Sequence, residues 1–345
     1  MSIDTPLNDL LRIQYPILLA AMDVVADAKL TRAVSAAGGF GILGAGYGDA
    51  DWLGRELALL EDTQDSPSLP FGIGFITWSL ANQPQLLDQA LAAKPAAVWL
   101  SFGDPAPFVE QIKKANALVI CQVQTEAMAH DAVMKGADII VAQGSEAGGH
   151  GVSRSSMTLV PAVVDAVGHK APVVMAGGVA DGRGLAAAMM LGAQGVVLGT
   201  RFYACQEAAG HPDAKARIVA ASGDDTTRSI VFDVSRNNVW PAPYTGRCLI
   251  NDHSRKWAGR EMELMRHRHE EGERYLAARS NGDFNTAAVI AGEAVGLIRD
   301  VPTAKEIIQR LMADANQLLD GASRIGSLRS SATHSADAKS ISIGA

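Results

Sequence analysis

The residues best suited to acid–base chemistry lie in one glycine-rich segment near the middle of the chain. Residues 143–151 read QGSEAGGHG and follow an apolar run, so His150 stands among small residues at the end of an expected strand. An imidazole titrates near neutral pH and can accept a proton under physiological conditions. A lone histidine is more often structural, but the other seven histidines have no comparable setting. We therefore predict that His150 is a general base.

Two glycine motifs farther along the chain are suited to binding a phosphate group. Gly177 and Gly178 follow one apolar run, and Gly199 with Thr200 follows the next. Glycine lets backbone N–H groups approach a phosphate that a Cβ would block, and a helix N-terminus and the Thr200 hydroxyl can add donors. The alternative is a purely structural role, in which these glycines only let the chain turn. Two motifs at consecutive strand ends favour a ligand that carries a phosphate.

Two other strand ends could contact a flat ring. Gln122 closes an apolar run and could hydrogen-bond a heterocycle, although a strand-end glutamine can also be purely structural. Ala20-Ala21-Met22 combines a thin backbone with a polarizable side chain, although methionine is as often a core filler.

The glycines at 39, 41 and 44 match the pattern G-x-G-x-x-G. The dinucleotide fingerprint needs a strand, then the glycines, then a helix. Here the glycines follow a helical segment and enclose the strand, so we reject a Rossmann site and expect them to let the chain turn and approach a ligand. The chain has no G-x-x-x-x-G-K-[ST] motif for a nucleoside triphosphate either.

Eight strand-sized apolar runs must position these residues. Such runs, apolar on both faces, are typical of parallel strands covered on both sides. They are Ile17–Ala21, Phe40–Leu43, Phe71–Phe75, Ala97–Leu100, Leu118–Val123, Ile139–Ala142, Val173–Ala176 and Val196–Leu198. The apolar runs alternate with helical segments, which predicts an α/β fold of the (β/α)8 TIM-barrel type. The alternative is a doubly wound open sheet.

Helical segments separate the apolar runs. Their apolar residues recur at helical spacing and several end at a glycine. They are Asp27–Ala37, Gln85–Ala93, Glu126–Lys135, Thr158–Val167 and Leu185–Leu191. A last helix, Ala304–Leu319, is expected to be the eighth helix of the barrel.

The chain divides into a barrel and an insertion. The barrel is predicted over residues 1–222 and 286–322. Residues 223–285 are charged and irregular and predict a smaller, mostly helical subdomain, inserted after strand 8 over the barrel mouth. Residues 323–345 are rich in Ser, Ala and Gly and predict a disordered tail.

Composition narrows the class of protein. In 345 residues, 48% are hydrophobic and 30 Lys and Arg face 37 Asp and Glu, a net charge of −7. This composition argues against disorder and against a nucleic-acid partner. The scattered Cys121, Cys205 and Cys248 fit reduced thiols and no metal site. The chain shows no secretory signal and no apolar run of about 18 residues, so we expect a cytoplasmic protein without a membrane partner.

These motifs resemble the nitronate monooxygenase family, formerly called 2-nitropropane dioxygenases, which are FMN-dependent TIM-barrel flavoenzymes. The resemblance covers nearly the whole chain except the tail. It is carried by Pro16–Met22 (PILLAAM), Ala33–Gly46, Ala142–Gly151, Val174–Gly178, Gly195–Phe202 (GVVLGTRF), Trp240-Pro241, Gly246-Arg247 and Trp257–Glu261.

The resemblance implies FMN as cofactor and His150 as catalytic base. The implied cofactor-binding residues are Ala20, Ala21, Met22, Gly74, Gln122, Gly144, Glu146, Gly148, Gly149, Gly177, Gly178, Gly199 and Thr200. The first-strand motif of the family often reads Ala-Pro-Met, whereas this chain has Ala21 in place of the proline. Proline fixes φ, so this turn is expected to be looser here.

The leading hypothesis is FMN-dependent oxidation of a nitroalkane or alkyl nitronate by dioxygen to a carbonyl compound and nitrite. Phe75, Trp78 and Phe102 would form an apolar wall for a small organic substrate. The first alternative is an FMN-dependent NAD(P)H reductase of quinones or enoyl thioesters. A flavin-free sugar-phosphate isomerase or lyase, and a non-catalytic flavin-binding protein, stay open. The protein is expected to be a monomer or a homodimer.

Overall fold

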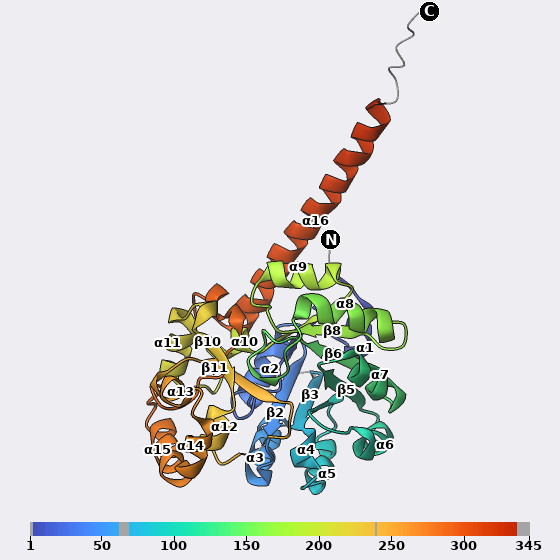
Figure 1. Ribbon diagram of the computed structural model, residues 1–345. Helices are drawn as coiled ribbons and strands as arrows, with labels where there is room; N and C mark the ends of the chain where they lie inside the picture. Colours follow the sequence, from blue (N-terminus) through green and yellow to red (C-terminus); the bar gives the residue numbers. More distant parts are fainter. Residues whose placement is uncertain (1–2, 62–68, 239, 337–345) are drawn as a thin grey trace, which may run out of the picture.

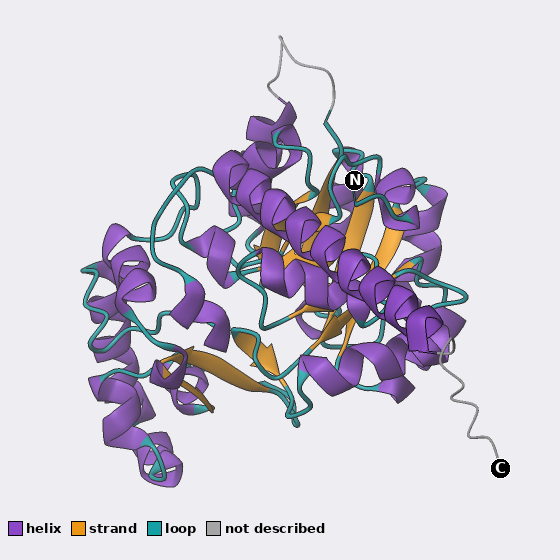
Figure 2. Cartoon of the chain, turned by 90° about the horizontal axis from the view of Figure 1, so that it is seen from above, coloured by secondary structure: helices purple, strands orange, loops and turns teal. Residues whose placement is uncertain are grey.

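The structure, a computed structural model, describes residues 3–61, 69–238 and 240–336 and is built around an eight-stranded parallel barrel (Figures 1 and 2). The strand order is β1-β9-β8-β6-β5-β4-β3-β2, and a parallel bridge between Leu18 and Phe40 joins β1 to the start of β2 and closes the sheet. The strands are β1 (Ile17–Leu19), β2 (Gly41–Gly46), β3 (Phe71–Ile76), β4 (Ala97–Ser101), β5 (Leu118–Val123), β6 (Ile139–Gln143), β8 (Val173–Ala176) and β9 (Val196–Leu198). The predicted TIM barrel is confirmed.

The strands are apolar throughout because both of their faces are buried. In β4, Trp99 packs in the cluster inside the barrel, whereas Val98 and Leu100 pack in the cluster between the sheet and the helices. Helix α1 (Pro6–Leu11) places Leu7 in the inner cluster, close to Gly195 and Pro16, which precede β9 and β1. The N-terminal end of the barrel is therefore packed, and a ligand site must lie at the other end.

The G-x-G-x-x-G glycines pack against protein rather than against a ligand. A Cβ at Gly39 would meet the carbonyl oxygen of Ile17 at 2.8 Å, and one at Gly44 would meet the carbonyl oxygen of Met22 at 2.2 Å. These glycines let β2 approach neighbouring backbone, so the expectation that they approach a ligand is corrected. The rejection of a dinucleotide fingerprint is consistent with this position.

An outer layer of helices covers the barrel (Figure 2). It contains α2 (Ala28–Ala36), α3 (Ala50–Glu61), the short α4 (Thr77–Leu80), α5 (Gln85–Ala92), α6 (Ala106–Lys114), α7 (Glu126–Met134), α8 (Ser156–Val167), α9 (Gly182–Met190) and α16 (Ala304–Ala336). Helix α16 packs against α9 and α2 and buries Ile307, Ile308 and Leu311, which is the place of an eighth barrel helix.

Helix α16 is longer than the sequence predicted. It continues past Gly321 to Ala336 and projects from the body of the molecule (Figure 1). The predicted disordered tail from residue 323 is corrected to this extent, and its last part, 337–345, lies outside the described residues. One glycine costs a helix only about 1 kcal/mol, and the residues that follow include good helix formers.

The segment after β9 forms a second hydrophobic core. Its cluster includes Tyr203, Phe232, Tyr275 and Ile298, and so reaches beyond the predicted limits 223–285, which remain a prediction. The segment contains α10 (Thr200–Tyr203), α11 (Pro212–Ala220), the 3₁₀ turn η1 (Gly223–Asp225), β10 (Thr226–Ser229), α12 (Val231–Ser235), β11 (Thr245–Leu249), α13 (Asp252–Trp257), α14 (Glu261–Arg266), α15 (Arg268–Ser280) and η2 (Glu293–Leu297).

A small antiparallel sheet, which the sequence did not predict, joins this segment to the barrel. Its order is β10-β11-β7, and β7 (Gly149–Gly151) belongs to the glycine-rich loop after β6. His150 pairs with Gly246 of β11. The loop that carries the predicted base is therefore held as a strand.

The three cysteines are free and buried, and burial raises the pKa of Cys121 and Cys248 to about 12. No group of His, Cys, Asp and Glu in the described residues could hold a metal ion. Among the helices of the described ranges, none is both long and apolar enough to cross a membrane.

Candidate active site

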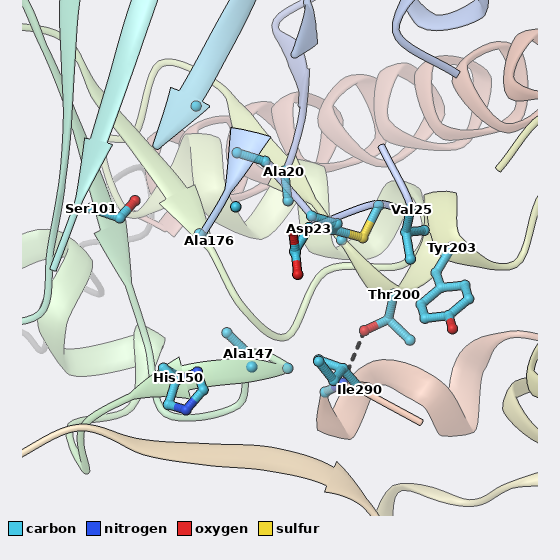
Figure 3. A pocket seen from close by; sticks show the side chains of 18 of the residues that line it. Ala20, Asp23, Val25, Ser101, Ala147, His150, Ala176, Thr200, Tyr203 and Ile290 are labelled. Carbon is cyan, nitrogen blue, oxygen red and sulfur yellow. Dashed lines mark hydrogen bonds between the residues drawn. The ribbon is translucent and has the colours of Figure 1, made fainter. Parts of the chain in front are cut away.

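A cavity of about 390 Å³ opens at the C-terminal ends of the barrel strands. Figure 3 shows it between the strand ends, marked by Ala20, Ser101 and Ala176, and the β7 segment with His150 on the opposite wall. Residues after β9, including Arg236 and Trp240, complete the lining. The site therefore lies between the barrel and the second core.

The structure brings nearly all the predicted site residues to this cavity. The lining contains Ala20, Ala21, Met22, Gly74, Gln122, Glu146, Gly148, Gly149, His150, Gly177, Gly178, Gly199 and Thr200. Gly144 is the exception, because a Cβ there would meet the Ser156 Oγ at 2.0 Å rather than the cavity. Glu146 lines the cavity, but its carboxylate accepts hydrogen bonds from the N–H and Oγ of Ser156 at the start of α8.

The two glycine turns present backbone to the cavity. Gly177 and Gly178 have φ of +99° and +78°, which favours glycine, and a Cβ at Gly178 would meet no protein atom nearer than 3.8 Å. In the described chain neither N–H donates a hydrogen bond to the backbone or to a side chain. Thr200 Oγ1 accepts a hydrogen bond of 2.9 Å from the Gly292 N–H, the dashed line in Figure 3, which leaves its own proton available. Such groups can hold an anion.

Gln122 is part of an amide network that reaches the histidine loop. Its Nε2 donates to Gln143 Oε1 at 3.0 Å, as does Gln124 Nε2 at 2.8 Å. Gln143 Nε2 in turn donates to the carbonyl oxygen of His150 at 3.0 Å. Gln143 therefore couples the cavity-lining Gln122 to the position of His150.

His150 is a buried imidazole with one nitrogen engaged. Its Nε2 lies 3.0 Å from both carboxylate oxygens of Asp233 on α12, and the side chain is 8% exposed. The Trp240 ring stacks on it with centroids 3.4 Å apart and an interplanar angle of 8°. No group in the described chain hydrogen-bonds to Nδ1.

The surroundings favour a neutral imidazole. Burial lowers the pKa of His150 below its usual value and outweighs Asp233, which acts in the opposite direction, while Arg236 and Arg228 add to the lowering. A neutral ring whose Nε2–H donates to Asp233 has its lone pair on Nδ1. The ring is therefore in the protonation state that a base requires.

Arg236 neutralises the buried carboxylate. Its Nη2 donates to Asp233 Oδ1 at 2.7 Å, and its Nε donates to the carbonyl oxygen of Phe232 at 3.2 Å. Burial opposes its charge, but the nearby Tyr47, Tyr275 and Asp233 outweigh burial and raise the pKa of Arg236.

An aromatic cluster covers His150. Tyr47, Trp78, Phe102 and Tyr244 surround Trp240 with centroid distances between 5.0 and 6.3 Å, and the Trp240 indole N–H donates to the Tyr47 hydroxyl at 2.9 Å. Of the predicted wall, Phe75 and Phe102 line the cavity, whereas Trp78 packs edge-to-face with Trp240 and is not among the lining residues.

Asp23 also directs its carboxyl group into the cavity (Figure 3). Burial raises its pKa, and Arg279 and Arg236 act against that rise. Asp23 directly follows the predicted Ala20-Ala21-Met22, so its position at a strand end was a signal that the sequence analysis did not use.

The family model for nitronate monooxygenase matches residues 4–89 and 77–314. The nitronate monooxygenase of Neurospora crassa is 33% identical, with 88% of this chain and 89% of that protein covered. A relative from Mycobacterium tuberculosis, named as a (3aS,4S,5R,7aS)-5-hydroxy-7a-methyl-1-oxo-octahydro-1H-indene-4-carboxyl-CoA dehydrogenase, is 28% identical, with 94% and 99% covered.

The solved structure of FabK from Thermotoga maritima superposes with a TM-score of 0.83 and 31% identity, over 94% of this chain and all of that one. Family model, relatives and structure all span the barrel together with the second core. The chain thus belongs to the nitronate monooxygenase family, as its motifs indicated, and is a flavin-dependent oxidoreductase.

Proposed function

We propose that this protein uses FMN to oxidise alkyl nitronates or nitroalkanes with dioxygen, giving a carbonyl compound and nitrite, with His150 as the base. The observation that carries the proposal is a neutral imidazole with a free Nδ1 on the same cavity as two open glycine turns. A nitroalkane has an acidic proton on the carbon that bears the nitro group. A base of this kind is what its ionisation needs.

The residues that line the cavity would suit both the phosphate and the flat ring of FMN. The free N–H groups of Gly177 and Gly178 and the Thr200 hydroxyl suit a phosphate. Gly74 faces Ala21, since a Cβ at Gly74 would lie 2.2 Å from the Ala21 Cβ, and this close approach keeps that wall thin for a flat ring. Bound FMN supplies the redox chemistry between substrate and dioxygen, and the protein supplies position and polarity.

The protein's own residues would prepare the substrate. His150 Nδ1 accepts the α-proton of a neutral nitroalkane, and the ring orients a substrate that is already ionised. Phe75, Phe102 and Trp240 line the cavity and keep water from the imidazole. The protonated ring is then stabilised by the Asp233 carboxylate 3.0 Å away.

An anaerobic mixing experiment tests the proposal. Purified protein that carries FMN is mixed with ethylnitronate or with NADH, and the flavin absorbance is followed. We expect ethylnitronate to bleach the flavin rapidly and NADH to leave it oxidised. Bleaching by NADH alone would contradict the proposal and favour a reductase.

A second candidate has one observation in its favour. The Mycobacterium tuberculosis relative, named as a dehydrogenase of a CoA ester, covers this chain as fully as the nitronate monooxygenases do. An FMN enzyme acting on a thioester is therefore the alternative, and anaerobic bleaching by an acyl-CoA but not by ethylnitronate would identify it. A flavin-free isomerase or lyase is set aside by the family. The cytoplasmic location and the monomer or homodimer stay predictions.

A further inference from the structure

His150 and Asp233 meet although they are far apart in the sequence. His150 belongs to β7 in the loop after β6, and Asp233 belongs to α12 in the second core. Both side chains are nearly buried, with exposed fractions of 8% and 6%. The contact is symmetric, because both carboxylate oxygens lie 3.0 Å from Nε2.

Each partner of this pair is itself held in place. Arg236, one turn along the same segment, donates to Asp233 Oδ1, so the carboxylate cannot rotate freely. The ring of His150 is fixed on one face by Trp240, and its backbone pairs with Gly246. Each oxygen of this buried carboxylate therefore has a hydrogen-bond partner.

This arrangement decides which nitrogen can act as a base. A carboxylate only accepts hydrogen bonds, so Nε2 must carry the proton and Nδ1 must carry the lone pair. We propose that Asp233 is a positioning residue that fixes the Nε2–H tautomer of His150 and so presents Nδ1 to the substrate. The inference rests on the proposed function for its kinetic consequence, but not for the tautomer itself.

The groups that face His150 set the expected pH effect. They are Asp233 on α12, Arg236 directly after that helix, and Arg228 on β10. Asp233 favours the protonated ring, and the two guanidinium groups disfavour it. Loss of the Asp233 charge therefore lowers the pKa of His150 further, and the acid limb of a rate profile moves to lower pH. A defect that is only structural would lower the rate at every pH without moving the acid limb to lower pH.

The variant Asp233→Asn changes the pair with little change in volume. Arg236 keeps the amide oxygen on its own side, which turns the amide NH₂ toward Nε2. A donor at that place makes Nε2 the acceptor and moves the proton to Nδ1. Asp233→Glu retains the carboxylate and serves as the rescue. Ser235→Ala is the matched control, because Ser235 lies on α12 but contacts His253 instead of His150.

The first readout needs no substrate. Protein with ¹⁵N-labelled histidine and bound FMN is examined by long-range ¹H–¹⁵N NMR, and the His150 signals are assigned as those absent from His150→Asn. We expect the Nε2–H tautomer in the wild type, in Asp233→Glu and in Ser235→Ala, and the Nδ1–H tautomer in Asp233→Asn. An Nδ1–H tautomer in the wild type, or no change in Asp233→Asn, would overturn the inference.

The second readout compares two substrates. For neutral nitroethane we expect Asp233→Asn to lower kcat/KM by at least about 100-fold, since loss of the base removes a factor of this size. For pre-ionised ethylnitronate the loss should stay within about fivefold. Equal losses on both substrates, with the tautomer unchanged, would overturn the inference. A wild type that oxidises neither substrate but shows the expected tautomers would contradict the proposed function alone.

Discussion

The imidazole of His150 lies between an indole and a carboxylate that act on its protonation in opposite directions. Trp240 stacks on the ring and contributes to the burial that lowers the pKa of His150, whereas Asp233 favours the charged form. The balance keeps the ring neutral and still offers a carboxylate to the imidazolium that forms after proton transfer. Removal of either neighbour should therefore move the pKa, and in opposite directions.

Replacement of Trp240 by alanine should raise the pKa of His150 toward its ordinary value. The change admits water to the ring face and reduces the desolvation that is the largest cause of the shift. The acid limb of the kcat/KM profile for nitroethane is expected to move to higher pH. Tyr244→Phe is the control, because the Tyr244 ring packs edge-to-face with Trp240, with centroids 6.3 Å apart, and loss of its hydroxyl should leave the limb in place. A limb that moves to lower pH in Trp240→Ala would contradict this account.

Gly199 offers a test of the phosphate site that separates binding from stability. Its φ is −100°, and a Cβ would lie 3.5 Å from the Ala20 Cβ and 3.8 Å from the Met22 Sδ, so alanine fits the protein without strain. We expect Gly199→Ala to change the free energy of unfolding of the apoprotein by less than about 0.5 kcal/mol. If a phosphate approaches this backbone, the Kd for FMN should rise at least about tenfold.

Fluorescence titration of the apoprotein with FMN measures this effect. Gly321→Ala is the control, since a Cβ there meets no atom within 4 Å and the position is remote from the cavity. An unchanged FMN affinity in Gly199→Ala would remove Gly199 from the site.

The sequence identified the glycines and His150 because each stands in a dense motif at a strand end. It missed Asp233, Arg236 and the role of Trp240, which lie in a segment without regular spacing. Asp233 lies in a five-residue helix, and nothing local in the sequence indicates that it meets a loop more than eighty residues earlier. Such a pairing depends on the tertiary fold, which spacing alone does not reveal.

At the scale of elements, two guanidinium groups join the histidine loop to the second core. Arg247 of β11 donates to the carbonyl oxygen of Ser145 at 3.0 Å, and Arg228 makes the larger set of contacts. Arg228 of β10 donates to the carbonyl oxygens of Gly149, Thr245, Ser145 and Ala147. Burial, with help from the neighbouring Arg247, lowers the pKa of Arg228 to about 10. The β7–β11 pairing and this side chain together hold His150 at the cavity wall.

The strands of the barrel could be predicted from the sequence, whereas those of the small antiparallel sheet could not. All eight barrel strands were predicted because they are apolar on both faces. The strands β7, β10 and β11 were missed because GHG, TTRS and TGRCL show no alternation of apolar and polar residues. The end of α16 was placed too early because Gly321 was given too much weight.

The first turns of helix α16 pack on the barrel, so shortening a side chain on its buried face should destabilise the protein more than the same change on its exposed face. Ile308 is fully buried and lies 3.2 Å from the Cβ position at Gly39. We expect Ile308→Ala to lower the free energy of unfolding by about 2–5 kcal/mol. Leu318→Ala, on the same helix but 45% exposed, should cost less than about 1 kcal/mol. Urea titrations measure both, and equal losses would contradict the position of α16 on α9 and α2.

At the scale of the whole molecule, two buried histidines make the free energy of unfolding depend on pH. Burial lowers the pKa of both His150 and His253. Below about pH 6.5 the unfolded chain binds protons that the folded chain does not, so stability is lost as pH falls from there toward the folded pKa values. Asp23 and Asp27, whose pKa values are raised by burial, act in the opposite sense at lower pH.

We therefore expect the free energy of unfolding to decrease between pH 7.5 and pH 6.0, by at most about 1.4 kcal/mol per pH unit for each histidine. The decrease should be smaller in His150→Asn. His169→Asn, at an exposed position, should behave as the wild type. Urea unfolding at the two pH values measures this, and a stability that rises on acidification across this window would contradict the buried neutral state of His150.

The central claim is that FMN in the barrel mouth and the imidazole of His150 act on one substrate. The most direct test is anaerobic single-turnover bleaching of the bound flavin, measured in the wild type and in His150→Asn with both nitroethane and ethylnitronate. We predict that both substrates bleach the wild type. In His150→Asn we predict that FMN stays bound and ethylnitronate still reacts, while nitroethane slows by at least about 100-fold. Equal nitroethane rates in the two proteins, or a wild-type flavin that neither substrate bleaches, would contradict the account.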